Sequence, residues 1–231
     1  MESLSKIIKN RAKARLREFD VGAKFSHLSS RKFSVLLPLV VKEGELQVLL
    51  TVRSKQLRRS PGQVCFPGGK SDPSDKDEIA TALREAQEEV GLDPQHVEVI
   101  CRLVPCVDQT GGVVTPVVGF IENISQLRLN PDEVSEVFLV PLEYFLRPQI
   151  YKKLQMTFLS NSSYVHCFDY VDPQNQVTYR IWGLTAKIAV FLALIVVEKK
   201  PSFDVEYDLN ALMSSSEHSF MQSYSRQKNK L

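Results

Sequence analysis

The chain has 231 residues, of which 43% are hydrophobic and 9% aromatic, and its formal net charge is +2. This length and apolar content are typical of one sizeable core and argue against a second large domain. The small charge does not favour a nucleic-acid-binding protein. The four cysteines form no C-x-x-C pair, which argues against a zinc site or a disulfide framework and favours a reducing compartment.

The chain begins with a basic segment, residues 4–19, whose pattern predicts an amphipathic helix. Its cations are Lys6, Lys9, Arg11, Lys13, Arg15 and Arg17. A mitochondrial presequence is the competing interpretation, but Glu18 and Asp20 argue against it. Residues 33–41 and 46–52 follow as two predicted strands, and the intervening polar turn with Gly44 predicts a hairpin.

An arginine-rich loop comes next and leads into a glycine turn. Arg53, Arg58 and Arg59 carry forked guanidinium donors that match phosphate oxygens, although such residues can also merely decorate a loop. Backbone N–H groups of the Gly68-Gly69 turn are further candidate donors. We expect Arg53, Arg58 and this turn to bind a phosphate-containing substrate.

Three carboxylates follow on one face of a predicted helix, residues 75–90. Glu85, Glu88 and Glu89 have i, i+3, i+4 spacing, and Glu78 falls on the same face two turns earlier. Like charges at these spacings destabilise a helix unless a partner neutralises them. The simplest partner is a hard divalent cation, which prefers oxygen ligands. The competing interpretation is a solvated acidic face.

The flanks of this helix favour a site. Ser74 precedes Asp77 with capping-box spacing, and Gly91 followed by Pro94 predicts the end of the helix one turn after the last carboxylate. The side opposite the carboxylates is apolar and should be buried: Ile79, Leu83, Ala86 and Val90.

The remaining sequence predicts further strands and one buried helix. Residues 97–107, 113–121 and 137–140 read as strands, with a capped turn at 130–133. Residues 184–197 are apolar but too short to span a membrane, and Lys187 interrupts them. We divide the chain into a basic helical extension at 1–28, a domain at 29–205 and a polar tail at 206–231.

The segment from Gly69 to Leu92 resembles the Nudix box, G-x5-E-x7-R-E-U-x-E-E-x-G-U, where U is aliphatic. The second half matches at Arg84, Glu85, Ala86, Glu88, Glu89, Gly91 and Leu92. The first half has one extra residue, so that Asp75 or Asp77 replaces the glutamate that, in the family, orients the box arginine.

A second motif, residues 49–69, fits L-L-T-x-R-S-x3-R-x3-G-x3-F-P-G-G. It is similar to the signature of the coenzyme A diphosphatase branch of Nudix hydrolases, with its closest likeness to the peroxisomal members of animals. The resemblance implies an α/β fold, a Nudix-type α/β/α sandwich around a mixed β-sheet. It also implies hydrolysis of coenzyme A, and of acyl-coenzyme A thioesters, to 3′,5′-ADP and 4′-phosphopantetheine or its acyl derivative.

The resemblance assigns roles to the box residues. Glu85, Glu88 and Glu89 would bind Mg²⁺ or Mn²⁺, and Arg84 would hold these glutamates in place. The general base stays open between Glu85, Glu88, Glu133 and Glu136. Two other functions stay open as well: a Nudix hydrolase of ADP-ribose or NADH, and a catalytically silent ligand-binding Nudix module. We expect a monomer with no membrane span.

The C-terminal tripeptide, Asn229-Lys230-Leu231, is similar to the S-K-L type of peroxisomal address, with asparagine in place of serine. We expect it to engage the peroxisomal import receptor; otherwise the chain would be cytoplasmic.

Overall fold

The computed structural model describes residues 3–29, 31–122, 124–158 and 161–228. The four α-helices of this part are α1 (Leu4–Glu18), α2 (Glu78–Val90), α3 (Gly183–Val197) and α4 (Leu212–Lys228). The strands of the main sheet are β1 (Lys32–Lys42), β2 (Glu45–Arg53), β3 (Val64–Cys65), β4 (Gly68–Lys70), β5 (Val97–Arg102), β6 (Cys106–Val107), β7 (Val113–Ile121) and β8 (Val134–Pro141). Three further strands form a second sheet: β9 (Tyr151–Phe158), β10 (Asn161–Val171) and β11 (Thr178–Trp182).

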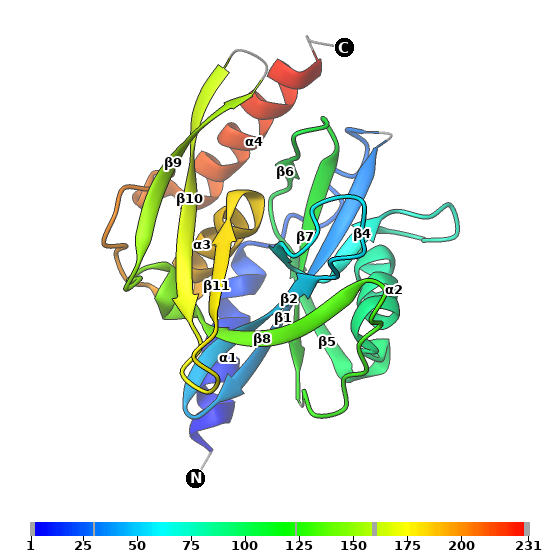
Figure 1. Cartoon of the computed structure of the whole chain (residues 1–231). Helices are drawn as coiled ribbons and strands as arrows, with labels where there is room; N and C mark the ends of the chain where they lie inside the picture. Colours follow the sequence, from blue (N-terminus) through cyan, green and yellow to red (C-terminus); the bar gives the residue numbers. More distant parts are fainter. Residues whose placement is uncertain (1–2, 30, 123, 159–160, 229–231) are drawn as a thin grey trace.

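The main sheet lies between helices (Figure 1). Its strand order is β3-β2-β1-β7-β5, while β4, β6 and β8 pair with β1, β7 and β2. Strands β1 and β7 are parallel and the other pairs are antiparallel, so the sheet is mixed. Side chains of α2 pack on one face, and those of α1 and α3 pack on the other. The expected α/β sandwich around a mixed sheet is confirmed.

Strand β1 is the centre of the core because its alternate side chains are buried on both faces. Leu36 and Val40 contact the α2 side, whereas Leu37 and Leu39 contact the α3 side. The predicted hairpin is confirmed, with Lys42 paired with Glu45 across the turn. Predicted strand 97–107 is interrupted and forms β5 and β6 instead.

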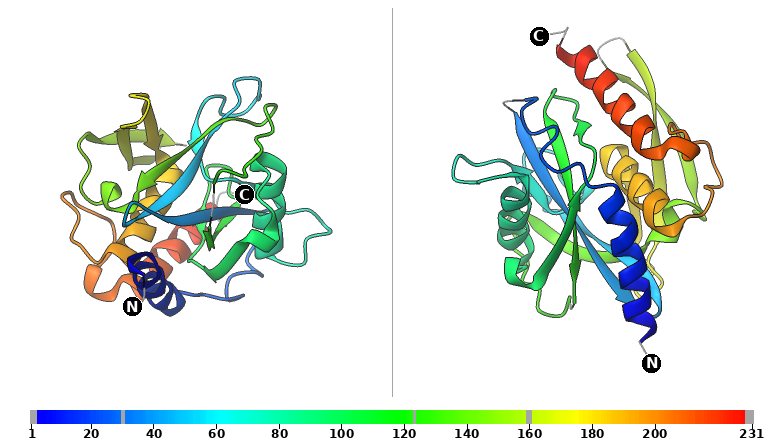
Figure 2. Two further views of the ribbon diagram at one scale, coloured as in Figure 1. Left: turned by 90° about the horizontal axis from the view of Figure 1, so that it is seen from below. Right: turned by 180° about the vertical axis from the view of Figure 1, so that it is seen from behind.

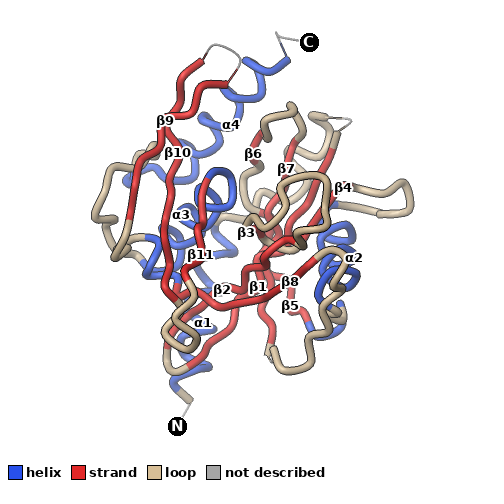
Figure 3. Tube along the Cα trace, viewed as in Figure 1, coloured by secondary structure: helices blue, strands red, loops and turns tan. Residues whose placement is uncertain are grey.

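The second sheet was not predicted from the sequence. Strands β9, β10 and β11 form an antiparallel sheet in the order β11-β10-β9 (Figure 3). The alternation in β11, where Tyr179 and Ile181 are buried and Thr178 and Arg180 are exposed, is the period-two signal that indicates such a strand. This sheet packs on α3, the predicted apolar helix, whose buried residues lie on all its sides.

Both terminal segments lie against the domain, as the rear view shows (Figure 2). The predicted basic helix is confirmed as α1, which buries Leu16 and forms an ion pair between Lys13 and Glu98. The segment expected as a polar tail contains α4, which buries Ser216 and packs Phe220 against Phe25 at a ring distance of 5.1 Å. Within the described residues, no helix is long and apolar enough to cross a membrane.

Candidate functional site

Helix α2 carries the three predicted carboxylates, and its ends are fixed by local capping. It begins at Glu78, because the Asp77 carboxylate accepts a hydrogen bond from the Ala80 N–H at 2.8 Å. The Ser74 capping box was therefore a wrong prediction: the Ser74 hydroxyl instead donates to Asp72 at 2.7 Å. Gly91 ends the helix in the left-handed conformation, with φ 67°, as predicted.

The glycine turn lies directly against two of these carboxylates. The Gly68 N–H donates to Oε2 of Glu89 at 3.0 Å. A Cβ at Gly69 would lie 2.4 Å from a carboxylate oxygen of Glu85, so a side chain there would displace that carboxylate. Pairing of Gly68 and Gly69 with Val35 and Ser34 of β1 holds the turn in place. The structure thus brings Glu85, Glu89 and the glycine turn together.

Arg84 organises the same face through several ion pairs. Its Nη1 donates to Glu85 at 3.0 Å and to Glu88 at 3.1 Å. Its Nε and Nη2 donate to the two oxygens of Asp75 at 3.0 and 2.9 Å, a two-pronged pair. Of the two aspartates that could replace the box glutamate, Asp75 holds the arginine and Asp77 caps the helix.

The fourth carboxylate predicted on this face, Glu78, does not join the site. Glu78 is buried and accepts a hydrogen bond from Nη1 of Arg102 on β5 at 3.0 Å. Its charge is therefore neutralised within the fold. Glu88, in contrast, has a side chain that is 54% exposed, at the open side of the cluster.

Burial makes two of the carboxylates hard to ionise. Glu89 is only 4% exposed. Its pKa is raised to about 7, with burial as the largest cause; Glu85 and Glu133 also raise it, whereas the Gly68 N–H and Arg53 lower it. Burial also raises the pKa of Glu85, although Arg84 opposes this shift. A bound cation would therefore favour the ionised form of both carboxylates.

Glu133 completes the acidic cluster from a different segment. Its backbone carbonyl accepts from the Ser54 N–H at 2.8 Å, and its carboxylate accepts from Nδ2 of Asn130 at 3.4 Å. The Asn130 N–H donates to the Glu89 carbonyl at 2.9 Å, which ties this turn to the end of α2. Glu136 is engaged elsewhere, because its Oε2 accepts from the Tyr179 hydroxyl at 2.9 Å.

Gly91 allows this turn to approach the helix. A Cβ at Gly91 would lie 2.8 Å from the carbonyl oxygen of Arg128. The Arg128 N–H in turn donates to the Val90 carbonyl at 2.9 Å. The box glycine thus ends the helix and also leaves room for the segment that carries Glu133.

The three arginines of the loop occupy different positions. Arg53 is half-buried, close enough to Glu89 to lower the pKa of that carboxyl, and its Nε donates to the Arg59 carbonyl at 3.4 Å. A register shift between Val52 and Arg53 in the pairing of β2 with β8 changes the direction of the strand at this point. Arg58 and Arg59 are exposed in the loop beyond it.

The donor set fits a divalent cation chemically. Carboxylate oxygens are the ligands that Mg²⁺ and Mn²⁺ prefer, and Glu85 and Glu89 are buried carboxyls whose ionised form lacks a full complement of partners. Within the described part of the chain, no three acidic, histidine or cysteine side chains converge as a preformed metal centre. The guanidinium of Arg84 donates to both Glu85 and Glu88, and the Glu88 side chain is 54% exposed.

The Arg84–Asp75 pair predicts an acid-sensitive contribution to stability. Hydrogen bonds from Arg84 lower the pKa of Asp75 from 3.8 to about 2. Because the folded-state pKa is depressed, the stabilisation is complete at neutral pH and is lost as the pH falls from 4 toward 2. We expect Asp75→Asn to lower the urea midpoint at pH 6 and to have a much smaller effect near pH 2. Equal effects at both pH values would contradict this assignment.

Comparison with known proteins identifies relatives over most of the chain. A family profile described as the NUDIX domain matches residues 31–176. The chain is 54% identical over 217 residues to the peroxisomal coenzyme A diphosphatase NUDT7 of Mus musculus, which covers 94% of this chain and 92% of that protein. It is 39% identical over 163 residues to the mitochondrial Nudix hydrolase 15 of Arabidopsis thaliana, which covers 70% of this chain and 56% of that protein. It is 45% identical over 167 residues to the uncharacterized Nudix hydrolase NudL of Salmonella newport, with coverage of 72% and 83%.

Proposed function

This chain belongs to the NUDIX family of hydrolases, and we propose that it cleaves the diphosphate of coenzyme A to 3′,5′-ADP and 4′-phosphopantetheine. Acyl-coenzyme A thioesters would give acyl-phosphopantetheine by the same cleavage. One observation carries the proposal: the basic loop after Arg53 is fixed against the acidic cluster. The Ser54 N–H donates to the Glu133 carbonyl at 2.8 Å, which supports a role for the loop arginines as phosphate donors at this site.

Glu85, Glu88 and Glu89 would hold the divalent cation, Mg²⁺ or Mn²⁺. When bound, the cation supplies positive charge to the phosphate oxygens and lowers the pKa of the attacking water. Arg84 acts as a positioning residue, since it contacts two of the three glutamates and is itself held by Asp75.

Glu133 is the general base that the geometry favours. Arg84 engages Glu85 and Glu88 at 3.0 and 3.1 Å, and the Tyr179 hydroxyl engages Glu136 at 2.9 Å. The contact to the Glu133 carboxylate is a longer one, 3.4 Å, from the neutral amide of Asn130. Glu133 would accept one proton from a water as the water oxygen attacks a phosphorus atom. The P–O bond to the bridging oxygen then breaks, and the electron pair stays on that oxygen in the departing phosphate. One water is consumed and two phosphate monoesters result.

The phosphates of the substrate would bind to donors on the other side of the cluster. Arg53 interacts electrostatically with Glu89, and the Gly68-Gly69 turn adjoins Glu85 and Glu89, so these residues would contact the diphosphate. The exposed Arg58 lies further out in the loop, where it would reach the ribose 3′-phosphate.

This assignment of Arg58 gives a substrate-specific expectation. Arg58→Ala should raise KM for coenzyme A more than KM for dephospho-coenzyme A, because only the former carries the 3′-phosphate. Steady-state kinetics on both substrates measures the difference. An equal rise of KM for both substrates would show that Arg58 does not recognise that phosphate. Lys55→Ala, in the same exposed loop, is the control for a general loss of positive charge.

The choice of substrate is tested by comparing kcat/KM for coenzyme A, dephospho-coenzyme A, ADP-ribose and NADH under one set of conditions. The proposal predicts that coenzyme A is the best of the four. A higher kcat/KM for ADP-ribose or NADH than for coenzyme A would be consistent with the acidic site, but it would contradict the assignment of Arg53 and Arg58 to the phosphates of coenzyme A. Absence of turnover on all four would favour the ligand-binding module.

Residues 29–205 would form the catalytic domain, with 1–28 and 206–231 as extensions. The targeting tripeptide, Asn229-Lys230-Leu231, lies outside the described residues. The peroxisomal relative supports a peroxisomal location for this chain. The tripeptide would then be the address that binds the import receptor. Deletion of Leu231 should leave an N-terminally tagged protein diffuse in the cytosol, whereas unchanged punctate import would refute the assignment.

A further inference from the structure

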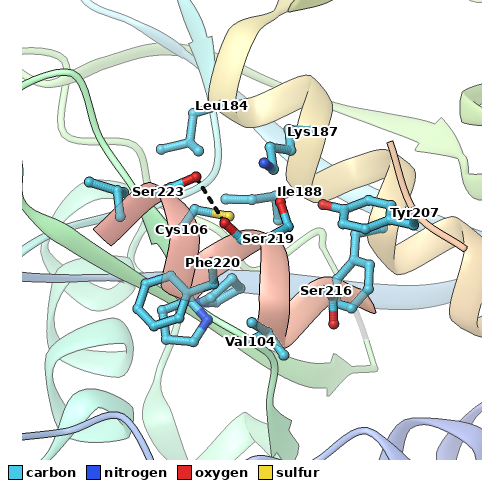
Figure 4. Close-up of a pocket in the computed structure, with 14 residues that line it drawn as sticks. Val104, Cys106, Leu184, Lys187, Ile188, Tyr207, Ser216, Ser219, Phe220 and Ser223 are labelled. Atoms are coloured by element: carbon cyan, nitrogen blue, oxygen red, sulfur yellow. Dashed lines mark hydrogen bonds between the residues drawn. The ribbon is translucent and has the colours of Figure 1, made fainter. Parts of the chain in front are cut away.

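The cavity between β6, α3 and α4 lies apart from the acidic cluster (Figure 4). Cys106, Lys187 and Ser219 are among the residues that line it, and its volume is about 50 Å³. Its cation, Lys187, pairs with Glu206, with Nζ 2.5 Å from Oε1. Helix α3 packs on the face of the main sheet opposite α2. Further residues of the proposed reaction are therefore expected on the α2 side, where the carboxylates lie.

Asn130 joins two parts of the acidic cluster through its backbone. Its N–H donates to the carbonyl of Glu89, near the end of α2, at 2.9 Å. Its own carbonyl accepts from the Glu133 N–H at 3.0 Å and from the Val134 N–H at 2.8 Å. These bonds fix the turn that carries Glu133 relative to the end of α2.

The amide of Asn130 has a defined orientation. Its Oδ1 accepts from the Asp132 N–H at 3.2 Å, a contact that only an acceptor can make. The other end of the amide is therefore the donor, Nδ2, and it lies 3.4 Å from Oε1 of Glu133. This distance is long for a hydrogen bond, but such contacts of catalytic groups often tighten when the substrate binds.

We propose that Asn130 is a positioning residue that orients the Glu133 carboxylate for proton transfer, an inference that rests on the proposed diphosphatase function and on Glu133 as its base. A neutral amide suits this task. It fixes one carboxylate oxygen without the full positive charge by which an arginine would favour the ionised form and so weaken the base. Because the amide engages Oε1, Oε2 would be the oxygen that accepts the proton of water.

Asn130→Asp tests this role, because it keeps an acceptor for the Asp132 N–H and replaces the donor with a carboxylate oxygen that repels Glu133. We expect kcat for coenzyme A to fall by about 10–100-fold with little change in KM, since misplacing a reacting group by about 1 Å has effects of this size. Asn130→Ser keeps an acceptor for the same N–H but is too short to reach Glu133, and it should show the same loss. It is the second variant in case Asn130→Asp fails to fold, which circular dichroism would show.

Asn175→Asp is the matched control. Asn175 makes the same pair of side-chain contacts in another turn: its Oδ1 accepts from the Val177 N–H at 2.8 Å, and its Nδ2 donates to the Tyr179 hydroxyl at 3.4 Å. Neither contact involves Glu133, so we expect kcat to stay within about twofold of wild type.

A double-mutant cycle with Glu133→Gln separates positioning from a purely structural role. If Asn130 acts through Glu133, Asn130→Asp should lower kcat by no more than about twofold in the Glu133→Gln background. An equal loss in both backgrounds, or wild-type kcat for Asn130→Asp, would overturn the inference. Wild-type kcat for Glu133→Gln alone would remove Glu133 as the base and the inference with it. Failure of the proposed function would show differently, as no cleavage of coenzyme A by the wild-type protein.

Discussion

Replacing Glu89 with glutamine should lower kcat by about 10²–10⁴ while the fold remains intact, a range typical of removing an essential catalytic carboxylate. Glu89 is 4% exposed and accepts the Gly68 N–H at 3.0 Å, so it joins the glycine turn to the proposed cation site. Glutamine keeps the size of the side chain and a carbonyl acceptor for that N–H. The substitution therefore removes charge with little change in packing.

The same substitution should stabilise the metal-free protein at alkaline pH. Burial raises the pKa of Glu89 to about 7. Because the folded-state pKa lies above the ordinary value of 4.5, the stability that protonation provides is lost as the pH rises from 4.5 through 7. Glu89→Gln would avoid this loss, which is about 3 kcal/mol at pH 8 in the presence of a chelator.

Kinetics and chemical unfolding in EDTA measure the two effects on one set of samples. Glu18→Gln, an exposed charge change on α1, is the control for both. If Glu89→Gln has a lower kcat and a higher free energy of unfolding in EDTA than the wild type, then Glu89 serves the reaction and does not stabilise the fold. Near-normal turnover in both Glu88→Gln and Glu89→Gln would instead remove the metal-site assignment.

The second large effect is expected at Glu133. Glu133→Gln should lower kcat by about 10²–10⁴, because the group that accepts the proton of water is lost. Its backbone contacts to Ser54 and Asn130 do not depend on the carboxylate, so the turn should keep its conformation.

Glu136→Gln provides the matched control, since Glu136 lies three residues further along and its carboxylate is engaged by Tyr179 at 2.9 Å. We expect its kcat to stay within a few-fold of wild type. The reverse result, a large loss for Glu136→Gln and a small one for Glu133→Gln, would move the general base to Glu136.

Local spacing was sufficient to predict the acidic helix. The i, i+3, i+4 pattern placed Glu85, Glu88 and Glu89 together, and Gly91 ends α2 as expected. Glu78 lies on the same helix face but pairs with Arg102 of β5. The sequence could not predict this pair, since helical periodicity gives the direction of a side chain and not the strand that it meets. The predicted start of the helix was wrong for a similar reason, since Ser74 and Asp77 are both residue types that cap helices. In the structure the Ser74 hydroxyl donates to Asp72 and the Thr81 hydroxyl donates to Asp75, which leaves Asp77 to accept the Ala80 N–H as the cap.

Features that depend on distant contacts were not accessible from the sequence. Asp75 and Asp77 were equivalent candidates for the partner of Arg84 until the fold placed Asp75 against the guanidinium. The second sheet went unrecognised because β9 carries polar residues that resemble a loop. Its position matters for the site, since Tyr179 of β11 is what engages Glu136.

The most direct test of the central claim is identification of the products formed from coenzyme A, with and without Mg²⁺ or Mn²⁺. Purified protein and substrate would be incubated, and the mixture separated and analysed by mass spectrometry. The account predicts equal amounts of 3′,5′-ADP and 4′-phosphopantetheine, formed only when the metal is present. Intact coenzyme A under both conditions, or cleavage at a bond other than the diphosphate, would contradict it.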